Sequence, residues 1–133
     1  MQFQSFIPIK KEWDIVAARQ QGRDMSKQIG FGSVDQARIA TAISELARNI
    51  YLYAEQGKIC FEILDDMEHK GIKIIAKDDG PGIPDVGKVM EDGYTTSGGL
   101  GAGLPGIKRL MDYFDIVSEE GKGTEVTVQK WLR

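Results

Sequence analysis

The chain contains very little of what builds disulfides, histidine-based metal clusters or serine-hydrolase sites. Among its 133 residues there is one cysteine and one histidine. Cys60 permits no internal disulfide, and its place in an apolar, strand-like stretch favours a buried structural thiol. Because His69 is alone and lies in a polar stretch, a histidine metal cluster and a Ser-His-Asp triad are both excluded.

Long apolar runs and an excess of positive charge are also missing. No stretch approaches the roughly 20 apolar residues of a membrane span, and the first residues lack the basic start and apolar core of a secretory signal. The formal net charge is −3, whereas a general nucleic-acid binder shows a basic surplus or stripe. We therefore expect a cytoplasmic protein that binds neither membranes nor nucleic acid.

The composition is otherwise ordinary for a globular protein. Hydrophobic residues make up 41% of the chain and charged residues 28%. A chain of this length buries about two-thirds of its unfolded surface around one core. We expect a single domain over residues 1–133.

The spacing of apolar residues predicts alternating helices and strands. The clearest helix could be capped by Ser33 or Asp35 and runs to Tyr53, with an apolar stripe at 4-3-4-3 spacing that should lie flat on a sheet. The other expected elements are an edge strand over 5–9, a helix over 12–29 that Gly30 ends, strands over 58–64 and 72–76, a short helix near 86–91, a helix over 103–113, and strands over 115–118 and 124–131.

This order of elements predicts a two-layer α/β sandwich. The strands over 58–64 and 72–76 are joined by a short turn, which an antiparallel pair allows and a parallel pair does not. We expect a mixed, mostly antiparallel sheet that about three helices cover on one face.

The first of three chemical motifs lies on the helix that ends near Tyr53. Glu45 and Asn49 are four residues apart, so they stack on one helix face at the rim of the core. The asparagine oxygen can help to hold a hard cation such as Mg²⁺, and the carboxylate can orient or deprotonate a hydroxyl. A solvated surface pair is the alternative that the residues alone leave open.

The second motif follows an apolar strand. Asp78 opens an Asp-x-Gly-x-Gly segment, where its carboxylate can accept a hydrogen bond from an exocyclic amine such as that of adenine. Gly80 and Gly82 have no side chains and let a flat ring approach the backbone. A plain Asp-Gly-Pro-Gly turn is the alternative.

The third motif is a run of glycines before a helix. Gly99, Gly101 and Gly103 would leave backbone N–H groups free to surround phosphate oxygens, and the start of the next helix adds a favourable dipole. Leu104 argues against a solvated linker, which is the alternative interpretation. The connection over residues 78–101 is long for a compact domain, and such connections are usually functional lids or disordered.

These motifs, in this order and followed by Gly123-Thr124, resemble those of the GHKL superfamily of gyrase-type, Hsp90-type and histidine-kinase ATPases. Within it, a chain this short is similar to the anti-sigma-factor serine kinases. Three longer strings are similar to the switch kinases of bacterial stressosomes: Trp13 to Arg19, Ser44 to Tyr51 and Thr96 to Leu104.

The resemblance implies an ATP- and Mg²⁺-dependent serine/threonine kinase. It implies that Glu45 is the catalytic base and that Asn49 coordinates Mg²⁺. Asp78 would bind the adenine amine, and Thr124 would help to fix the base. The glycine loop would hold phosphates under a lid over about residues 85–98. The expected cofactor-binding set is Asn49, Asp78, Gly80, Gly82, Gly99, Gly101, Gly103, Leu104 and Thr124.

The resemblance also implies protein partners. The family phosphorylates STAS-domain scaffold and antagonist proteins, and the released kinase activates a PP2C-type phosphatase. The alternative function is a nucleotide-gated binding module without significant kinase turnover. Related kinases often carry an arginine where this chain has Gly99, so the cation that stabilises the transferring phosphoryl group is open among Arg48, Lys88 and Lys108.

Overall fold

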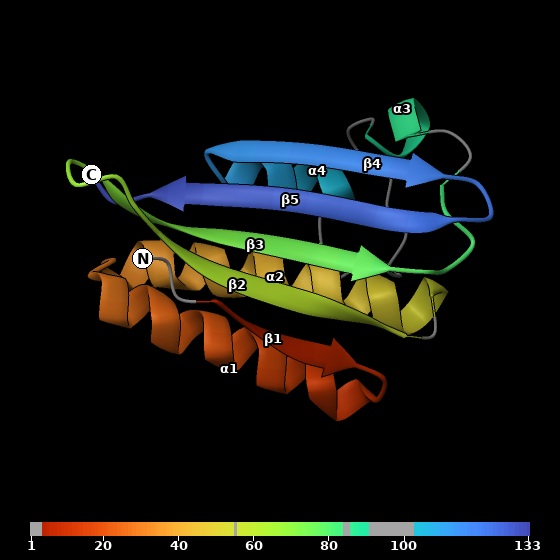
Figure 1. Cartoon of the computed structure of the whole chain (residues 1–133), viewed down its shortest axis with the longest axis horizontal. Helices are drawn as coiled ribbons and strands as arrows, with labels where there is room; N and C mark the ends of the chain where they lie inside the picture. Colours follow the sequence, from red (N-terminus) through yellow and green to blue (C-terminus); the bar gives the residue numbers. More distant parts are fainter. Residues whose placement is uncertain (1–3, 55, 84–85, 91–102) are drawn as a thin grey trace.

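Five strands form one sheet in which all pairings among the described residues are antiparallel. The computed structural model describes residues 4–54, 56–83, 86–90 and 103–133. The strand order is β1-β2-β3-β5-β4, so β1, which contains Pro8, lies at an edge as predicted (Figure 1). The strands are β1 (Gln4–Ile9), β2 (Gly57–Asp65), β3 (Lys70–Asp78), β4 (Tyr113–Glu119) and β5 (Gly123–Trp131).

The sheet is thus more uniform than the mixed sheet that we expected, and the reason lies in its connections. Short turns join β2 to β3 and β4 to β5, and a turn of this length can link only antiparallel neighbours. Both hairpins were predicted, and their strands extend one or two residues beyond most of the expected ends.

Helices α1 (Glu12–Ile29), α2 (Ser33–Tyr53) and α4 (Gly103–Leu110) cover one face of the sheet, and α3 (Val86–Val89) is a single turn (Figure 1). The bounds of α1 are those predicted, and Gly30 ends it with φ +116°. The predicted cap of α2 is wrong: Gly32 is its N-cap and no side chain caps it. Gly32 has no side chain, so the N–H groups of the first turn receive no oxygen from it.

Helix α4 ends earlier than predicted. Tyr113, which we placed in this helix, instead begins β4, where it pairs with Gln129. The backbone N–H of Asp112 already donates to the Gln129 carbonyl over 2.9 Å. The chain therefore leaves the helix at Leu110 because the ladder with β5 begins two residues later.

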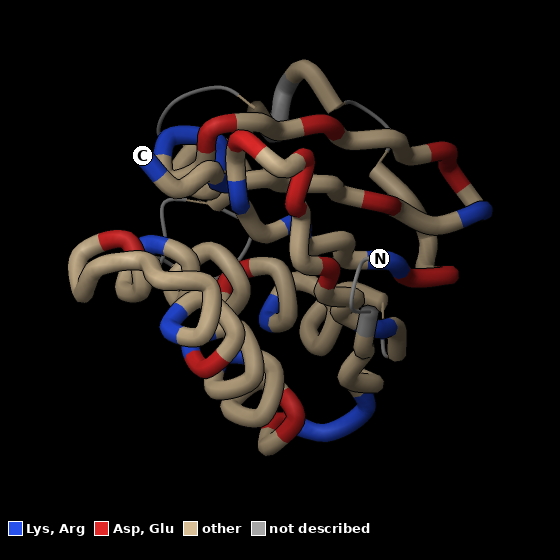
Figure 2. The backbone as a smooth tube through the Cα atoms, turned by 60° about the vertical axis from the view of Figure 1, so that its left-hand side comes forward, with Lys and Arg blue, Asp and Glu red and all other residues tan. Residues whose placement is uncertain are grey.

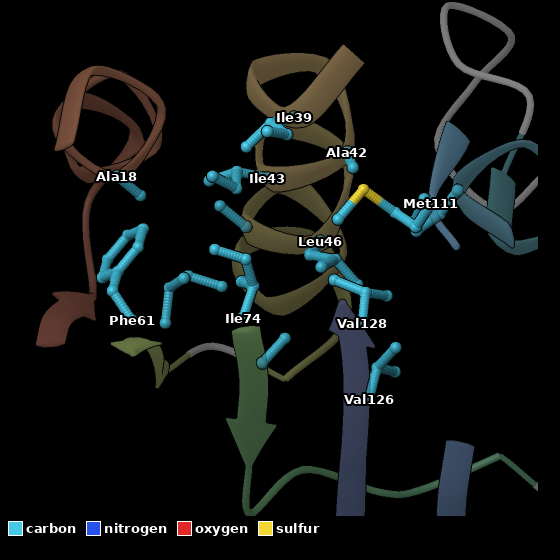
Figure 3. Close-up of a cluster of buried hydrophobic side chains, with 14 of the residues drawn as sticks. Ala18, Ile39, Ala42, Ile43, Leu46, Phe61, Ile74, Met111, Val126 and Val128 are labelled. Carbon is cyan, nitrogen blue, oxygen red and sulfur yellow. The ribbon is translucent and has the colours of Figure 1, made fainter. Parts of the chain in front are cut away.

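The core lies between α2 and the sheet. The apolar stripe of α2 is buried at Ile39, Ile43, Leu46 and Ile50, as its spacing predicts. Figure 3 shows side chains of α2 pointing toward the sheet residues Ile74 and Val128. Tyr53, the last residue of the stripe, is 50% exposed, because α2 ends there at the mouth of a cavity.

Glycine at position 22 brings α1 close to α2. A Cβ there would lie 2.0 Å from Cδ1 of Ile43 and 3.4 Å from the ring of Phe61. Both of these side chains are fully buried. A larger residue would therefore push α1 away from the rest of the core.

Charged residues of both signs occur in both layers of the fold. Figure 2 shows Lys and Arg positions interspersed with Asp and Glu positions over both layers. None of the helices in the described part of the chain is long and apolar enough to cross a membrane.

Candidate nucleotide site

A cavity of about 340 Å³ lies where the C-terminal half of α2 meets the ends of β3 and β5. Five of the residues predicted for cofactor binding line it together: Asn49, Asp78, Gly82, Leu104 and Thr124. Most of its other walls are apolar, including Ile50, Ala76 and Val126. Its size and its few polar groups among apolar walls are typical of a small-molecule site.

Asp78 stands at the end of β3, as predicted, and backbone N–H groups hold its carboxylate in place. Its Oδ1 accepts a hydrogen bond from the Gly80 N–H at 2.9 Å. Burial raises the pKa of this carboxyl group, hydrogen bonds from the backbone N–H groups of Gly80 and Thr124 oppose that shift, and the charge of Asp79 adds to it. The carboxylate is thus partly desolvated and pre-positioned to accept a further hydrogen bond.

Thr124 lies directly opposite Asp78 in the β3–β5 ladder. Its Oγ1 lies 2.8 Å from Oγ of Ser118, which also accepts the N–H of Ile83 at 2.7 Å and donates toward the Gly123 carbonyl at 3.2 Å. Ser118 therefore holds Thr124 and the loop after Asp78 in one arrangement. The sequence analysis missed this serine, although the register of the predicted hairpin places it opposite Thr124.

The glycines around Asp78 make room for other parts of the protein. A Cβ at Gly80 would lie 2.7 Å from Cβ of Ala54, and one at Gly82, where φ is +76°, would lie 2.3 Å from the Glu119 carbonyl oxygen. Gly82 also lines the cavity, but Gly80 is not among its described lining residues. Close packing thus explains both glycines without any ligand.

Gly103 and Leu104 begin α4 beside the cavity. Gly103 is buried with φ +68°, and Leu104 is a buried wall of the cavity. Gly99 and Gly101 lie outside the described residues, as do Asp85 and residues 91–98 of the expected lid. In the lid's described part, residues 86–89 form α3, which confirms the short helix predicted there.

Helix α2 places Asn49 and Glu45 in two neighbouring cavities. Asn49 lines the cavity with Asp78, whereas Glu45 lines a second cavity between α1 and α2. Glu45 is only 7% exposed, so it is buried more deeply than the rim position expected for it. The two residues are one helical turn apart on α2.

Two of the cations predicted as candidates to stabilise a transferring phosphoryl group, Arg48 and Lys108, lie in different surroundings. Neither Arg48 nor Lys108 is among the described residues that line it with Asp78. Nε of Arg48 is buried and has no hydrogen-bond partner in the described part of the protein. Lys108 is exposed on α4.

The oxygen atoms available from the protein suit a hard cation that the phosphates of a nucleotide mainly hold. Among the described residues there is no group of three or more His, Cys, Asp or Glu side chains that could bind a metal. Mg²⁺ does not need one, because it keeps several waters and takes phosphate oxygens together with one or two protein oxygens. The amide oxygen of Asn49 at the edge of the cavity fits that role.

Comparison with known proteins identifies the relatives of this chain. Residues 34–133 match the family described as histidine kinase-, DNA gyrase B- and HSP90-like ATPases. The chain is 66% identical to serine/threonine-protein kinase RsbT of Bacillus subtilis (strain 168) over 133 residues, which are 100% of both chains. It is 33% identical over 100 residues to the anti-sigma F factor of Clostridium novyi (strain NT), covering 71% of this chain and 70% of that one.

A solved structure shares the fold. The RsbU and RsbW domains of Rv1364c from Mycobacterium tuberculosis match with a TM-score of 0.68 at 16% identity, over 100% of this chain and 33% of that chain. The full-length identity and the family match together show to which family the chain belongs. The chain belongs to the histidine kinase-, DNA gyrase B- and HSP90-like ATPases and, within them, to the serine/threonine-protein kinases similar to RsbT.

Proposed function

We propose that this serine/threonine-protein kinase acts in the cytoplasm and transfers the γ-phosphoryl group of ATP to a hydroxyl of STAS-domain scaffold and antagonist proteins. The released kinase then binds and activates a PP2C-type phosphatase of a bacterial stress-signalling complex. One observation carries the nucleotide half of this proposal: Asp78, Thr124 and Asn49 line a single, mostly apolar cavity. The similarity to RsbT and to an anti-sigma factor supports the partner half.

The cavity would hold the base by its amine and the phosphates near α4. Asp78 would accept a hydrogen bond from the exocyclic amine of adenine, and Thr124 would fix the ring from the neighbouring strand. The backbone N–H groups of Gly99, Gly101 and Gly103 would position the phosphates. Charge neutralisation of those phosphates is what Mg²⁺ supplies when it is bound, and Asn49 would hold it.

Glu45 is proposed as the catalytic base. Phosphoryl transfer passes through a loose transition state, so the protein contributes mostly position and electrostatics. A carboxylate one turn from Asn49 and facing the next cavity would lie on the side from which a hydroxyl arrives. It would orient that hydroxyl and take its proton as the new bond forms.

The test is transfer of label from radioactive ATP, with magnesium, to a purified STAS-domain protein. Glu45→Gln and Glu45→Ala are expected to lower the transfer rate by about 100-fold or more, while calorimetric affinity for ATP stays near that of wild type. Glu68→Ala, in the exposed turn between β2 and β3, is the matched control and should transfer normally. An equal rate in the Glu45 variants and wild type would contradict the role of Glu45.

A binding module without turnover fits the chain less well. The kinase RsbT is similar over the full chain at 66% identity, whereas the anti-sigma F factor covers 71% of it at 33%. In the labelling experiment, wild-type protein that binds ATP but leaves the partner unlabelled would favour such a module. Failure to bind ATP at all would contradict both functions.

A further inference from the structure

The second cavity is a polar groove along the outside of the helix pair. It measures about 590 Å³, and we call it the α1–α2 groove. Arg19, Gln20 and Arg23 form its α1 side, and Glu45 lies on its α2 side. The rest of the α2 side consists of the small residues Ala37, Ala40, Thr41 and Ser44.

Side-chain size explains why a groove exists here. Positions 37, 40, 41 and 44 follow the 3-4 spacing of one helix face, and none of them carries a long side chain. On the core side of the same helix pair, Gly22 brings α1 against Ile43. The two helices are therefore closely packed below the groove, while small side chains leave it open above.

The rim of the groove carries positive charge in a chain whose net charge is −3. Arg19 and Arg23 are both exposed, and no hydrogen bond or ion pair recorded among the described residues engages either guanidinium group. Oδ1 of the nearby Asp24 accepts a hydrogen bond from Gln20 at 2.8 Å. Glu45 is the acidic group among the residues that line the groove, and it is only 7% exposed.

We propose that the α1–α2 groove docks an acidic segment of the partner protein, the segment that carries the acceptor hydroxyl. This inference rests on the kinase function proposed above. The arginines at the rim would bind carboxylates of the segment, and the hydroxyl would reach Glu45. Its oxygen bonds to the γ-phosphorus, the bond to the β–γ bridging oxygen breaks, ADP leaves with the electron pair, and the hydroxyl proton passes to Glu45.

The spacing of the arginines specifies the segment. Arg19 and Arg23 are four residues apart on α1, so their backbone positions are about 6 Å apart along the helix axis. Alternate residues of an extended segment are about 6.6 Å apart and point to the same side. An extended segment with Asp or Glu at two alternate positions therefore matches the pair, and each arginine can bind a carboxylate through two N–H groups.

The experiment measures the KM for the STAS-domain protein and, separately, the KM for ATP. Arg19→Gln/Arg23→Gln should raise the KM for the protein by about tenfold or more, because two charge-assisted contacts are lost. The KM for ATP should not change. Lys27→Gln, which removes a positive charge from the same helix outside the groove, is the matched control and should behave as wild type.

Three further measurements separate the possible outcomes. The charge-retaining variant Arg19→Lys/Arg23→Lys should keep most of the affinity, and added salt should weaken partner binding more in wild type than in the glutamine variant. Circular dichroism and calorimetric ATP binding show whether each variant is folded. If Arg19→Glu/Arg23→Glu abolishes transfer, changing the partner's acidic residues to lysine one at a time should restore it at the docking segment.

An unchanged KM for the partner in the folded glutamine variant would overturn the inference. So would a raised KM for ATP alone, because the arginines would then serve the nucleotide. Calorimetric binding of the STAS-domain protein to the glutamine variant and to wild type distinguishes these failures from failure of the kinase function. That binding can depend on the groove even where no phosphoryl group is transferred.

Discussion

At the scale of single residues, the proposed binding role of Asp78 would come at a cost to the stability of the fold. Burial raises the pKa of its carboxyl group above the ordinary 3.8, which means that the native state favours the protonated form more than the unfolded chain does. Ionisation therefore destabilises the native state as the pH rises from 3.8 through the raised native pKa. The ionised group is nevertheless the one suited to accept a hydrogen bond from an amine.

We expect Asp78→Asn to raise the free energy of unfolding of the nucleotide-free protein at neutral pH. The gain should shrink as the pH falls toward 3.8, because Asp78 then becomes neutral as well. Urea unfolding across this range checks both points. Asp79→Asn, which removes only the smaller contribution of the neighbouring charge, should give a smaller gain. A loss of stability in Asp78→Asn would contradict the sign.

The same substitution should weaken ATP binding. Asparagine keeps one oxygen for the Gly80 N–H but offers an NH₂ group where the carboxylate offers its second oxygen. A donor would then face the donor of adenine, and we expect a loss of affinity of about tenfold to 100-fold by calorimetry.

The sequence patterns predicted which side chains lie close together, but they did not predict which cavity each side chain lines. The Asp-x-Gly-x-Gly spacing placed Asp78 at a strand end, and the apolar stripe oriented α2 on the sheet. Stacking of Glu45 and Asn49 was also predicted, but their assignment to different cavities depends on α1, which packs along α2. The role of Ser118 was missed because it depends partly on a contact with Ile83, 35 residues away in the chain, which a hairpin register does not predict.

At the scale of elements, the β4–β5 turn packs against the end of the cavity that Asp78 and Thr124 line. Gly123 has φ +103°, and a Cβ there would lie 2.1 Å from the Asp78 carbonyl oxygen. The turn is thus pressed against the strand that carries Asp78. Sequence patterns predicted the Gly121-Lys122-Gly123 turn. Only the structure shows that Gly123 packs against the backbone of Asp78, whereas Gly121 has no neighbour within 4 Å of a Cβ.

We expect Gly123→Ala to cost more than about 2 kcal/mol of unfolding free energy, because backbone strain adds to a clash with backbone atoms. Gly121→Ala is the matched control: φ is +84°, but nothing lies within 4 Å of a Cβ there. It should cost about 1 kcal/mol from strain alone. Equal losses in urea unfolding would show that the contact with Asp78 is unimportant.

At the scale of the whole molecule, the cavity joins parts of the chain that are far apart in sequence. Its walls come from α2, β3, α4 and β5. At the opposite end, the buried Nζ of Lys130 donates to the Leu110 carbonyl at 2.9 Å and lies 3.9 Å from Asp35. A ligand in the cavity would therefore hold together elements that also share the core.

Nucleotide should accordingly stabilise the whole fold. We expect ATP with Mg²⁺ to add about 2.7 kcal/mol at a concentration of roughly 100 times its Kd. Removal of Mg²⁺ by EDTA should lower the gain, and GTP should add little, because its base has a carbonyl where adenine has the amine. Thermal unfolding monitored by circular dichroism measures all three, and equal shifts with ATP and GTP would contradict recognition of the amine by Asp78.

The orientation of the Ser118 hydroxyl decides whether Thr124 offers the cavity a hydrogen-bond donor or an acceptor. It has one proton but two possible acceptors, the Gly123 carbonyl and Oγ1 of Thr124. When that proton goes to Gly123, Thr124 must donate to Ser118 and shows only lone pairs to a ligand. When it goes to Thr124, the threonine proton turns toward the ligand instead. Rotation of one serine proton thus converts the wall from acceptor to donor without moving any heavy atom.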